Sequence, residues 1–481
     1  MREAAYLLGA TILAELILFI VLRMMSRVKS ARPEMPPSRK LVRNAIVVLV
    51  CPIAIHARYQ IEEFVAVVGH NLRSGTCSRQ CLVVAVSFVG LADAKVCGLK
   101  AHLVNGLSAV CREHGLKLLV VGKCSSSCRD SPWRKDQKVE DVIRATRGIS
   151  AGLVPYVGSL EHCASADYVL ILDEDSLLMR GADAVLLQAA LRAPKPICDG
   201  DAVTDGHGVF VPRMHQAFSA CASTAGGDPM FDAFGESSFC GKGLVAVDAY
   251  LQCIAGRLPR ELILSHDMIE GFLLRSARVE SAHLIELKSG SVAVKMSQLH
   301  RWCVGDVMNI LGMFVGRFSI PLRGFVMWHS LALLLSILAT IATPTLLILL
   351  GICWGVSGVA VALGAAILVR AIQVALMRQK CDLAWLGNQV MDILFISVPR
   401  AVVLCDAIGC ASCVMARGLA RPRWIPSSRG GSVGVPGRVI ISMFAVPALL
   451  TALAVLAQSW AIVVLSAFWF AVGVNLVRQR V

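Results

Sequence analysis

Long apolar segments are the feature of this sequence that most restricts how the chain can fold. One covers residues 5–22 and carries a single charge. Two more, at 326–350 and 356–376, are joined by a short loop without lysine or arginine, and 439–457 and 460–477 form a second such pair. Because about 20 apolar residues are enough for a helix to cross a bilayer, we expect one amino-terminal membrane helix and two membrane hairpins.

Basic residues flank these segments and set their expected orientation. The chain has 47 lysines and arginines against 33 acidic residues, a formal net charge of +14. They follow the first segment closely, from Arg23 to Arg43, and otherwise lie on the hairpin ends away from the short loops. Since cytoplasmic loops carry the excess of Lys and Arg, we expect the amino terminus outside and the chain after residue 23 on the cytoplasmic side. Membrane topology thus explains the charge, and we expect no nucleic-acid partner.

Two features favour a cytosolic rather than a secreted domain. A signal peptide is the alternative interpretation of the first segment, but its amino end carries both a basic and an acidic residue and no small-residue cleavage pattern follows it. The 18 cysteines are scattered, and the pairs Cys77/Cys81 and Cys124/Cys128 have no His or Cys partners nearby at zinc-ligand spacing. We therefore expect reduced thiols that face a cytosolic milieu.

Between the first segment and the hairpins, apolar strands alternate with amphipathic helices. The expected strands are residues 45–55, 80–90 and 117–124, and the helices between them include 60–72 and 99–114. The apolar residues of the helices recur at helical spacing, whereas the strands are short β-branched runs. This alternation predicts an α/β domain of Rossmann type with a mostly parallel, doubly wound sheet.

An acidic motif closes the next strand of this series. The apolar run from Tyr168 to Leu172 ends in Asp173, Glu174 and Asp175. Carboxylates at the carboxyl end of a parallel strand face the crevice where such sheets bind ligands. Two carboxylates one residue apart can both reach a hard divalent cation, as in proteins that hold the diphosphate of a sugar nucleotide. A plain acidic turn is the alternative for so short a motif.

Two later motifs suggest the chemistry. Residues 264–271 read LSHDMIEG, and residues 298–302 read QLHRW. Inverting sugar transfer needs a carboxylate that takes the proton from the attacking hydroxyl, and Asp267 is the candidate. Arg301 would neutralise the leaving diphosphate, and Trp302 offers an aromatic face to an acceptor sugar. The structural alternatives are a helix cap, a lipid-phosphate contact and a membrane-interface anchor, respectively.

The order of DxD, HD, QxxRW and a membrane hairpin resembles processive membrane glycosyltransferases such as cellulose, chitin and hyaluronan synthases. The intervening residues are more specifically similar to the glycosyltransferase domain of cyclic β-1,2-glucan synthases, glycosyltransferase family 84. The similar segments are RKDQKVED at 134–141, GHGVFVPRM at 206–214, residues 227–271, SQLHRWCVGDV at 297–307, WHSLALLL at 328–335 and VPRAVVLCDAIG at 398–409. The resemblance covers most of residues 41–425.

The resemblance implies a GT-A fold and inverting transfer of glucose from UDP-glucose to a growing β-1,2-glucan in a bacterial inner membrane. It implies that Asp173 and Asp175 bind Mg²⁺ or Mn²⁺ and that Asp267 is the base. Lys138 and Asp93, with Asp173, would contact the donor nucleotide. Gln298, Arg301 and Trp302 would line the acceptor end, where Glu236 and His266 are also expected, and Lys242 is matched in a structural or substrate-positioning role.

The chain also departs from that family. Ser237 stands where the family prefers glycine, Gly90 replaces an acidic residue on the uracil side, and the segment between Pro229 and Phe234 is shorter. Full-length members carry further membrane spans and carbohydrate-processing domains, for which 481 residues leave no room. We therefore expect a linear or short glucan, or a separate cyclising or export partner. The alternatives are a synthase of another β-glycan and a non-catalytic scaffold subunit of an envelope-glycan complex.

These expectations divide the chain into six parts. They are a membrane helix at 1–24, a basic linker at 25–40, a glycosyltransferase domain at 41–320, a membrane hairpin at 321–378, a cytosolic interface helix and linker at 379–436, and a membrane hairpin at 437–481. The interface helix is expected because residues 390–416 are apolar yet contain Arg400 and Asp406, which would be costly at the centre of a bilayer.

Overall fold

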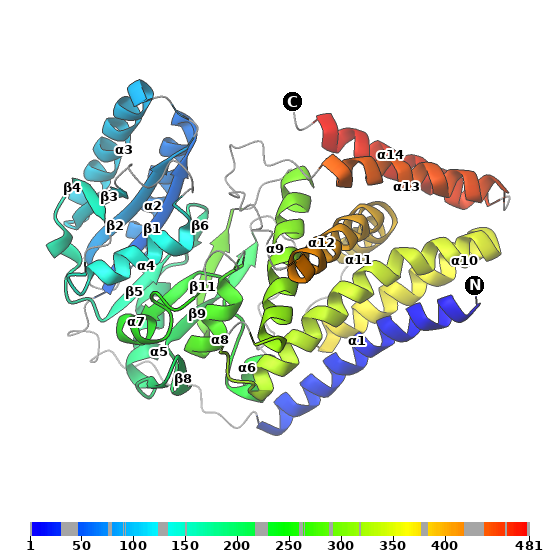
Figure 1. Cartoon of the computed structure of the whole chain (residues 1–481), viewed down its shortest axis with the longest axis horizontal. Coiled ribbons are helices and arrows are strands. Elements are labelled where there is room, and N and C mark those ends of the chain that lie inside the picture. The colour runs from blue at the N-terminus through cyan, green and yellow to red at the C-terminus, as the bar shows by residue number, and fades with distance from the viewer. Residues whose placement is uncertain are drawn as a thin grey trace.

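An α/β part and a helical part lie side by side in the computed structural model (Figure 1). It describes residues 2–29, 47–75, 79–89, 91, 93–123, 133–149, 152–216, 229–258, 263, 265–287, 292–316, 319–376, 383–417, 437–456 and 459–478. Gly90 and most of the basic linker at 25–40 lie outside these residues, as do Cys77, Cys124 and Cys128. The cysteines that the structure describes are free thiols.

The α/β part is built on a mixed sheet. Its strands are β1 (Val47–Ile55), β2 (Arg79–Phe88), β3 (Lys117–Lys123), β4 (Leu153–Val157), β5 (Tyr168–Ile171), β6 (Ser176–Leu178), β9 (Val209–Gln216), β10 (Gly243–Ala246) and β11 (Ser276–Glu286). Among the described residues the order is β4-β3-β2-β1-β5-β10-β9-β11-β6. Strands β3, β2, β1, β5, β9 and β11 run in one direction, and β4, β10 and β6 run against them. The predicted mostly parallel α/β domain is confirmed.

Helices cover both faces of this sheet. They are α2 (Arg58–Ser74), α3 (Asp93–Glu113), α4 (Lys135–Ala145), α5 (Ala182–Arg192), α7 (Val247–Cys253) and α8 (Asp267–Leu274), with a short helix η1 (Leu160–Cys163) and a hairpin of β7 (Ile197–Asp199) and β8 (Ala202–Asp205). Side chains of β1 alternate between two cores: Val48 and Val50 pack with α4, α7 and α8, whereas Leu49 packs with α2, α3 and α5. Burial on both faces explains why this strand is an unbroken apolar run.

A proline in β1 helps to open the sheet beside the acidic motif. The parallel pairing of β1 with β5 ends at Val50 and Ile171, and Leu172 then donates its N–H to the Val50 carbonyl at 3.1 Å. Pro52 stands two residues beyond Val50 and has no N–H to offer a neighbouring strand. The chain is therefore released from the sheet as it reaches Asp173.

The helical part consists of long apolar helices. It contains α1 (Arg2–Lys29), α9 (Val292–Phe314), α10 (Gly324–Leu376), α11 (Leu383–Met391), a π-helical turn η2 (Asp392–Ile396), α12 (Ser397–Arg417), α13 (Gly437–Leu456) and α14 (Trp460–Arg478), and a short helix α6 (Pro229–Phe234) lies at its edge. Helix α1 packs along α10, which folds back on itself at Gly355, where φ is 62° and ψ is −135°. Such a backbone conformation is open mainly to glycine.

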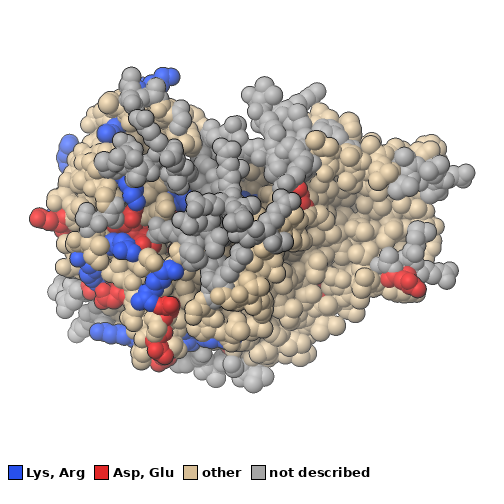
Figure 2. All heavy atoms as spheres, in the orientation of Figure 1, with Lys and Arg blue, Asp and Glu red and all other residues tan. Residues whose placement is uncertain are grey.

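The surface of this part is unusually apolar. Trp354, Val356 and Trp460 are each more than 60% exposed, and Figure 2 shows a broad uncharged surface over the helices, whereas charged side chains gather over the α/β part. By length and composition, Ala5–Ser26, Gly324–Leu376 and Trp385–Met415 could each cross a membrane, within the part of the chain that was searched. Exposed apolar area of this extent suits a lipid environment, so membrane association is indicated. The orientation and the number of crossings stay predictions.

Charged side chains inside the helical part are paired with one another. Asp392 accepts hydrogen bonds from Arg370 at 3.0 Å and from Arg400 at 3.0 and 2.5 Å, and Arg370 also donates to Gln389 at 2.7 Å. Pairing lowers the cost of placing charge among apolar helices. The predicted interface helix at 379–436 includes Trp385–Met415, and whether this segment lies along the membrane surface or crosses it stays a prediction.

Candidate functional site

The site lies at the carboxyl ends of β1, β2 and β5, where the acidic motif leaves the sheet. Hydrogen bonds from distant residues hold the turn in place. The Asn71 side chain of α2 donates to the Ser176 carbonyl and accepts from the Leu178 N–H, both at 2.7 Å. Ser176 N–H donates to the Asp173 carbonyl at 3.1 Å, and Leu287 N–H to the Asp175 carbonyl at 2.9 Å. The backbone of the motif is thus fixed on both sides, although the sequence did not point to Asn71.

Two lysines hold the first carboxylate of the motif. Lys135 Nζ lies 2.5 Å from Asp173 Oδ1, and Lys242 Nζ lies 3.3 Å from Asp173 Oδ2 and also contacts Glu286 at the end of β11. Burial favours the neutral acid, but the two ammonium groups outweigh it and hold the pKa of Asp173 below its usual range. Burial likewise disfavours the charged lysines, yet the carboxylates raise the pKa of both, so the cluster is ionised at neutral pH.

The acidic motif also suits a hard divalent cation. Carboxylate and diphosphate oxygens are the ligands that Mg²⁺ and Mn²⁺ prefer, and both donor types would meet at this edge of the sheet. Within the described residues, Asp173 and Asp175 belong to no group of three clustered protein ligands. A metal here would therefore need oxygens from the bound donor. Because lysines contact both oxygens of Asp173, a cation bound there would compete with Lys135 and Lys242.

Lys138 is buried near the same ends of the strands. Its ammonium group donates to the Ile53 carbonyl at 2.5 Å and to Ser87 Oγ at 2.7 Å, at the ends of β1 and β2. Burial lowers the pKa of Lys138 to about 7, and the nearby Glu174 opposes that shift only in part. A donor phosphate or uracil carbonyl bound at this point would replace the Ile53 carbonyl and the Ser87 hydroxyl as the acceptor of the Lys138 ammonium group. The predicted nucleotide contact remains a prediction.

Asp267, the predicted base, begins helix α8 beside a charged histidine. His266 Nδ1 lies 3.1 Å from Asp267 Oδ1 and 3.2 Å from Glu270 Oε1, and the Tyr250 hydroxyl donates to Glu270 at 3.3 Å. Burial would lower the pKa of His266, but the two carboxylates raise it to about 9. The imidazolium orients Asp267, whose side chain stays 31% exposed and so is open to a substrate. His266 therefore acts through Asp267 in this arrangement.

Gly241 gives the Asp267 carboxylate its space. Its φ is +74°, and a Cβ atom there would stand 2.6 Å from Asp267 Oδ1. Both the backbone conformation and the close approach demand glycine. Gly241 stands in the sequence segment FCGKG, but nothing in the spacing of the sequence relates it to Asp267.

Gly241→Ala is expected to lower activity about 100-fold or more by displacing the Asp267 carboxylate, since misplacing a catalytic group by 1 Å can cost that much. Gly148→Ala is the matched control. Gly148 has φ +71° but nothing within 4 Å of a Cβ, so it imposes the same backbone strain without the clash. Initial rates of both variants check the prediction, and equal rates would show that the close contact with Asp267 does not matter.

Two residues of α9 complete the surroundings of the base. The charges of Asp267 and Asp173 both act on Arg301, where burial lowers the pKa and these carboxylates oppose the shift. Asp306, which sequence reasoning missed, lies close enough that the Asp267 charge adds to burial in raising the pKa of Asp306 to about 6. The acidic motif and the predicted base therefore act on the same cations, Lys135 and Arg301.

Asp306→Asn is expected to remove a pH-dependent loss of stability. Because the folded pKa is raised, the contribution of Asp306 to stability is greatest at low pH and declines as the pH rises from the unfolded value towards 6. The thermal midpoint of Asp306→Asn relative to wild type should therefore rise by about 2–4 °C between pH 4.5 and pH 7.5. Asp248→Asn, on an exposed side chain, is the control and should show no such trend. A parallel pH dependence in wild type and Asp306→Asn would contradict this reading.

The remaining predicted residues lie farther from the carboxylates or in structural positions. Gln298 and Trp302 stand on α9, with Trp302 46% exposed and so open to a sugar ring. Glu236 is 3% exposed, and both its oxygens accept from Arg323, at 3.0 and 2.8 Å, just before α10. This ion pair links the α/β part to α10 and buries Glu236, so an acceptor sugar has little access to its carboxylate. Asp93 begins α3, but its side chain lies outside what the structure describes.

Comparisons with known proteins give one informative similarity. The chain is 32% identical over 160 residues to the cyclic beta-(1,2)-glucan synthase NdvB of Rhizobium meliloti (strain 1021). The aligned region covers 29% of this chain and 6% of that relative. No protein-family model matches. The chain thus spans a small fraction of the length of the curated relative that it matches.

Two solved structures resemble the chain distantly. One is the mannosyltransferase PcManGT of Pyrobaculum calidifontis in complex with GDP-Man and Mn²⁺, at 13% identity and a TM-score of 0.47, over 86% of this chain and all of that one. The other is S. aureus TarS, at 10% identity and a TM-score of 0.32, over 76% of this chain and 55% of that one. At TM-scores below 0.5 these likenesses carry no argument about the chemistry.

Proposed function

We propose that this protein is a membrane-bound inverting glucosyltransferase that uses UDP-glucose to extend a β-1,2-glucan. The observation that carries the proposal is the proximity of Asp173 and Asp267: Lys242 contacts Asp173 while its neighbour Gly241 packs against Asp267, and both charges act on Lys135 and Arg301. A diphosphate needs cations on one side of the reacting sugar, and the acceptor hydroxyl needs a carboxylate on the other. The similarity to NdvB supports glycosyl transfer and motivates the choice of donor and linkage.

In this proposal each group has one task. Lys135, Lys242 and Arg301 balance the charge that develops on the leaving UDP. Asp173 and Asp175 would hold Mg²⁺ or Mn²⁺, and such a cation would supply further positive charge at the diphosphate. Asp267 accepts the proton of the acceptor 2-hydroxyl. As the proton leaves, the hydroxyl oxygen forms the bond to C1 of glucose, and the bond from C1 to UDP breaks on the opposite face.

The helical part provides the setting for a growing polymer. We propose that its apolar helices lie in a bacterial inner membrane as a multi-pass region with the catalytic domain in the cytoplasm, since basic residues flank them on that side. Trp302, exposed on α9 beside these helices, would stack on the acceptor sugar.

Detergent-purified protein incubated with labelled UDP-glucose and Mg²⁺ or Mn²⁺ is expected to give a polymer in which linkage analysis finds 2-linked glucose. The metal-free reaction with a chelator should lose most of this incorporation. A differently linked product would keep the transferase and discard the linkage. Absence of turnover with any common UDP-sugar would favour a scaffold subunit.

A further inference from the structure

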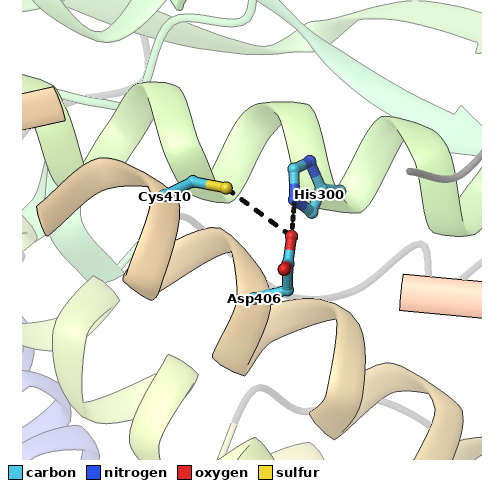
Figure 3. Close-up of side chains that lie close together, drawn as sticks. All are labelled: His300, Asp406 and Cys410. Carbon is cyan, nitrogen blue, oxygen red and sulfur yellow. Dashed lines mark hydrogen bonds and ion pairs between the residues drawn. The ribbon is translucent and has the colours of Figure 1, made fainter. Parts of the chain in front are cut away.

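Three side chains of metal-binding type meet where α9 packs on α12, outside the site described above. Figure 3 shows His300 from α9 pointing towards Asp406 and Cys410 of α12. His300 Nε2 lies 2.8 Å from Asp406 Oδ2, and the Cys410 thiol donates to the same oxygen at 3.6 Å. The imidazole nitrogen, carboxylate oxygen and thiol sulfur all lie within 4.8 Å of one another. They converge on a single point between two helices.

The two helices hold these side chains firmly. Asp406 and Cys410 are four residues apart, so they project from the same face of α12. Around them an apolar cluster that includes Cys303, Leu404 and Ala407 packs α9 against α12. His300 and Asp406 have side chains 13% and 19% exposed, which leaves a path from solvent. The cluster is thus largely preformed yet accessible.

We propose that His300, Asp406 and Cys410 form a zinc site that links α9 to α12. Imidazole, thiolate and carboxylate are the protein ligands of Zn²⁺, and a water molecule would complete a tetrahedral site. Zinc bond lengths set ligand separations of roughly 3.3–3.6 Å. The 3.6 Å between Cys410 Sγ and Asp406 Oδ2 lies within this range, and the 2.8 Å hydrogen bond between His300 Nε2 and Asp406 Oδ2 would lengthen by about 0.5 Å as the metal replaces its proton. Binding releases the thiol proton of Cys410 to solvent, and His300 coordinates through an unprotonated Nε2.

A simple ion pair between His300 and Asp406 accounts for only part of this arrangement. That pair alone can hold two helices together, but a thiol adds little to it and is a weak hydrogen-bond donor. As a third ligand, in contrast, the sulfur selects the metal. A soft thiolate favours zinc over the hard cations that suit the carboxylates of Asp173 and Asp175. The two sites would therefore bind different metals in the same protein.

The site would act on the position of α9. This helix carries Gln298, Arg301 and Trp302, the residues expected at the acceptor end. A metal at His300 would fix that segment relative to the helical part without touching substrate. The inference depends on the three ligands alone and stands or falls independently of the sugar that the protein transfers.

Co²⁺ binding to the full-length protein in detergent tests the inference, with a phosphine reductant to keep thiols reduced. After chelator treatment and dialysis, a Co²⁺ titration should produce a near-ultraviolet thiolate-to-metal charge-transfer band that saturates at one equivalent of Co²⁺. Added Zn²⁺ should displace the Co²⁺ and remove the band. Cys410→Ser should abolish the band, and His300→Gln, which keeps a donor to Asp406, should weaken Co²⁺ binding at least 10-fold. Cys413→Ser, on an exposed cysteine of the same helix, should bind like wild type.

Thermal unfolding separates loss of the site from loss of the fold. Metal-free Cys410→Ser and metal-free wild type should melt together, whereas added Zn²⁺ should raise only the wild-type midpoint. The absence of a thiolate band in wild type, or its persistence in Cys410→Ser at full intensity, would overturn the proposal.

Discussion

Asp267→Asn is expected to lower the rate of sugar transfer by about 10²–10⁴-fold, the usual contribution of a general base. Asparagine has the shape of aspartate but cannot take the proton of the acceptor hydroxyl. Donor affinity should change less than the rate, because Asp267 directly contacts His266, whereas Lys135 and Lys242 directly contact Asp173. Initial rates at saturating donor, together with the donor concentration for half-maximal rate, separate these two effects.

Asp248→Asn is a matched control for that substitution. Asp248 makes the same carboxylate-to-amide change on α7, but its side chain is 85% exposed and pairs only at the surface with Arg147. Its rate should equal that of wild type. If Asp267→Asn kept a tenth or more of wild-type activity, the base would have to be sought elsewhere, and Asp306 would be the next carboxylate to test.

The sequence anticipated the parallel half of the sheet closely. Strands expected at 45–55, 80–90 and 117–124 correspond to β1, β2 and β3, because each is an apolar run buried on both faces. The antiparallel strands were not anticipated. Strand β10 lies between β5 and β9, and its partners are set by contacts with residues far away in the chain. Periodicity reports which faces are buried but not which strands become neighbours.

The sequence pointed to those candidate site residues that stand in short motifs. Asp173 and Asp267 were found because a carboxylate after a strand or at a helix start is visible in the sequence. Their partners were not: Lys135 reaches Asp173 from α4, and Asp306 approaches Asp267 from α9. These pairings depend on how helices pack on the sheet. Glu236 is another case: its pairing with Arg323 was not visible in the sequence, and its expected place at the acceptor end stays a prediction.

The balance of charge in the crevice explains why one carboxylate of the acidic motif is paired before any donor binds. Without Asp173, Lys135 and Lys242 would lie close together with Glu286 as the remaining acidic partner contacting Lys242. Like charges in a partly buried site repel strongly. Asp173 therefore makes it possible to keep two cations ready for a diphosphate. Asp175, two residues later, is the second carboxylate of the motif that could bind a metal.

Asp173→Asn and Asp175→Asn are therefore expected to fail in different ways. Asp173→Asn should reduce transfer at least 100-fold and also destabilise the protein by about 2–3 kcal/mol, because it breaks a partly buried ion-pair cluster. Asp175→Asn should lose a comparable share of activity, and high Mn²⁺ should restore part of it. Rates against Mn²⁺ concentration and thermal midpoints at pH 7 measure both effects, with Asp205→Asn, 72% exposed, as control.

The pH dependence of stability adds an independent check on Asp173. Although burial opposes ionisation, the two lysines hold the pKa of Asp173 below its usual range. Its stabilising contribution is therefore complete above the unfolded pKa and disappears as the pH falls through the lower, folded value. The gap in thermal midpoint between wild type and Asp173→Asn should close on acidification, whereas the exposed control Asp205→Asn should show no comparable gap at any pH. A gap that stays constant from neutral to acid pH would mean that the lysine contacts do not govern the ionisation of Asp173.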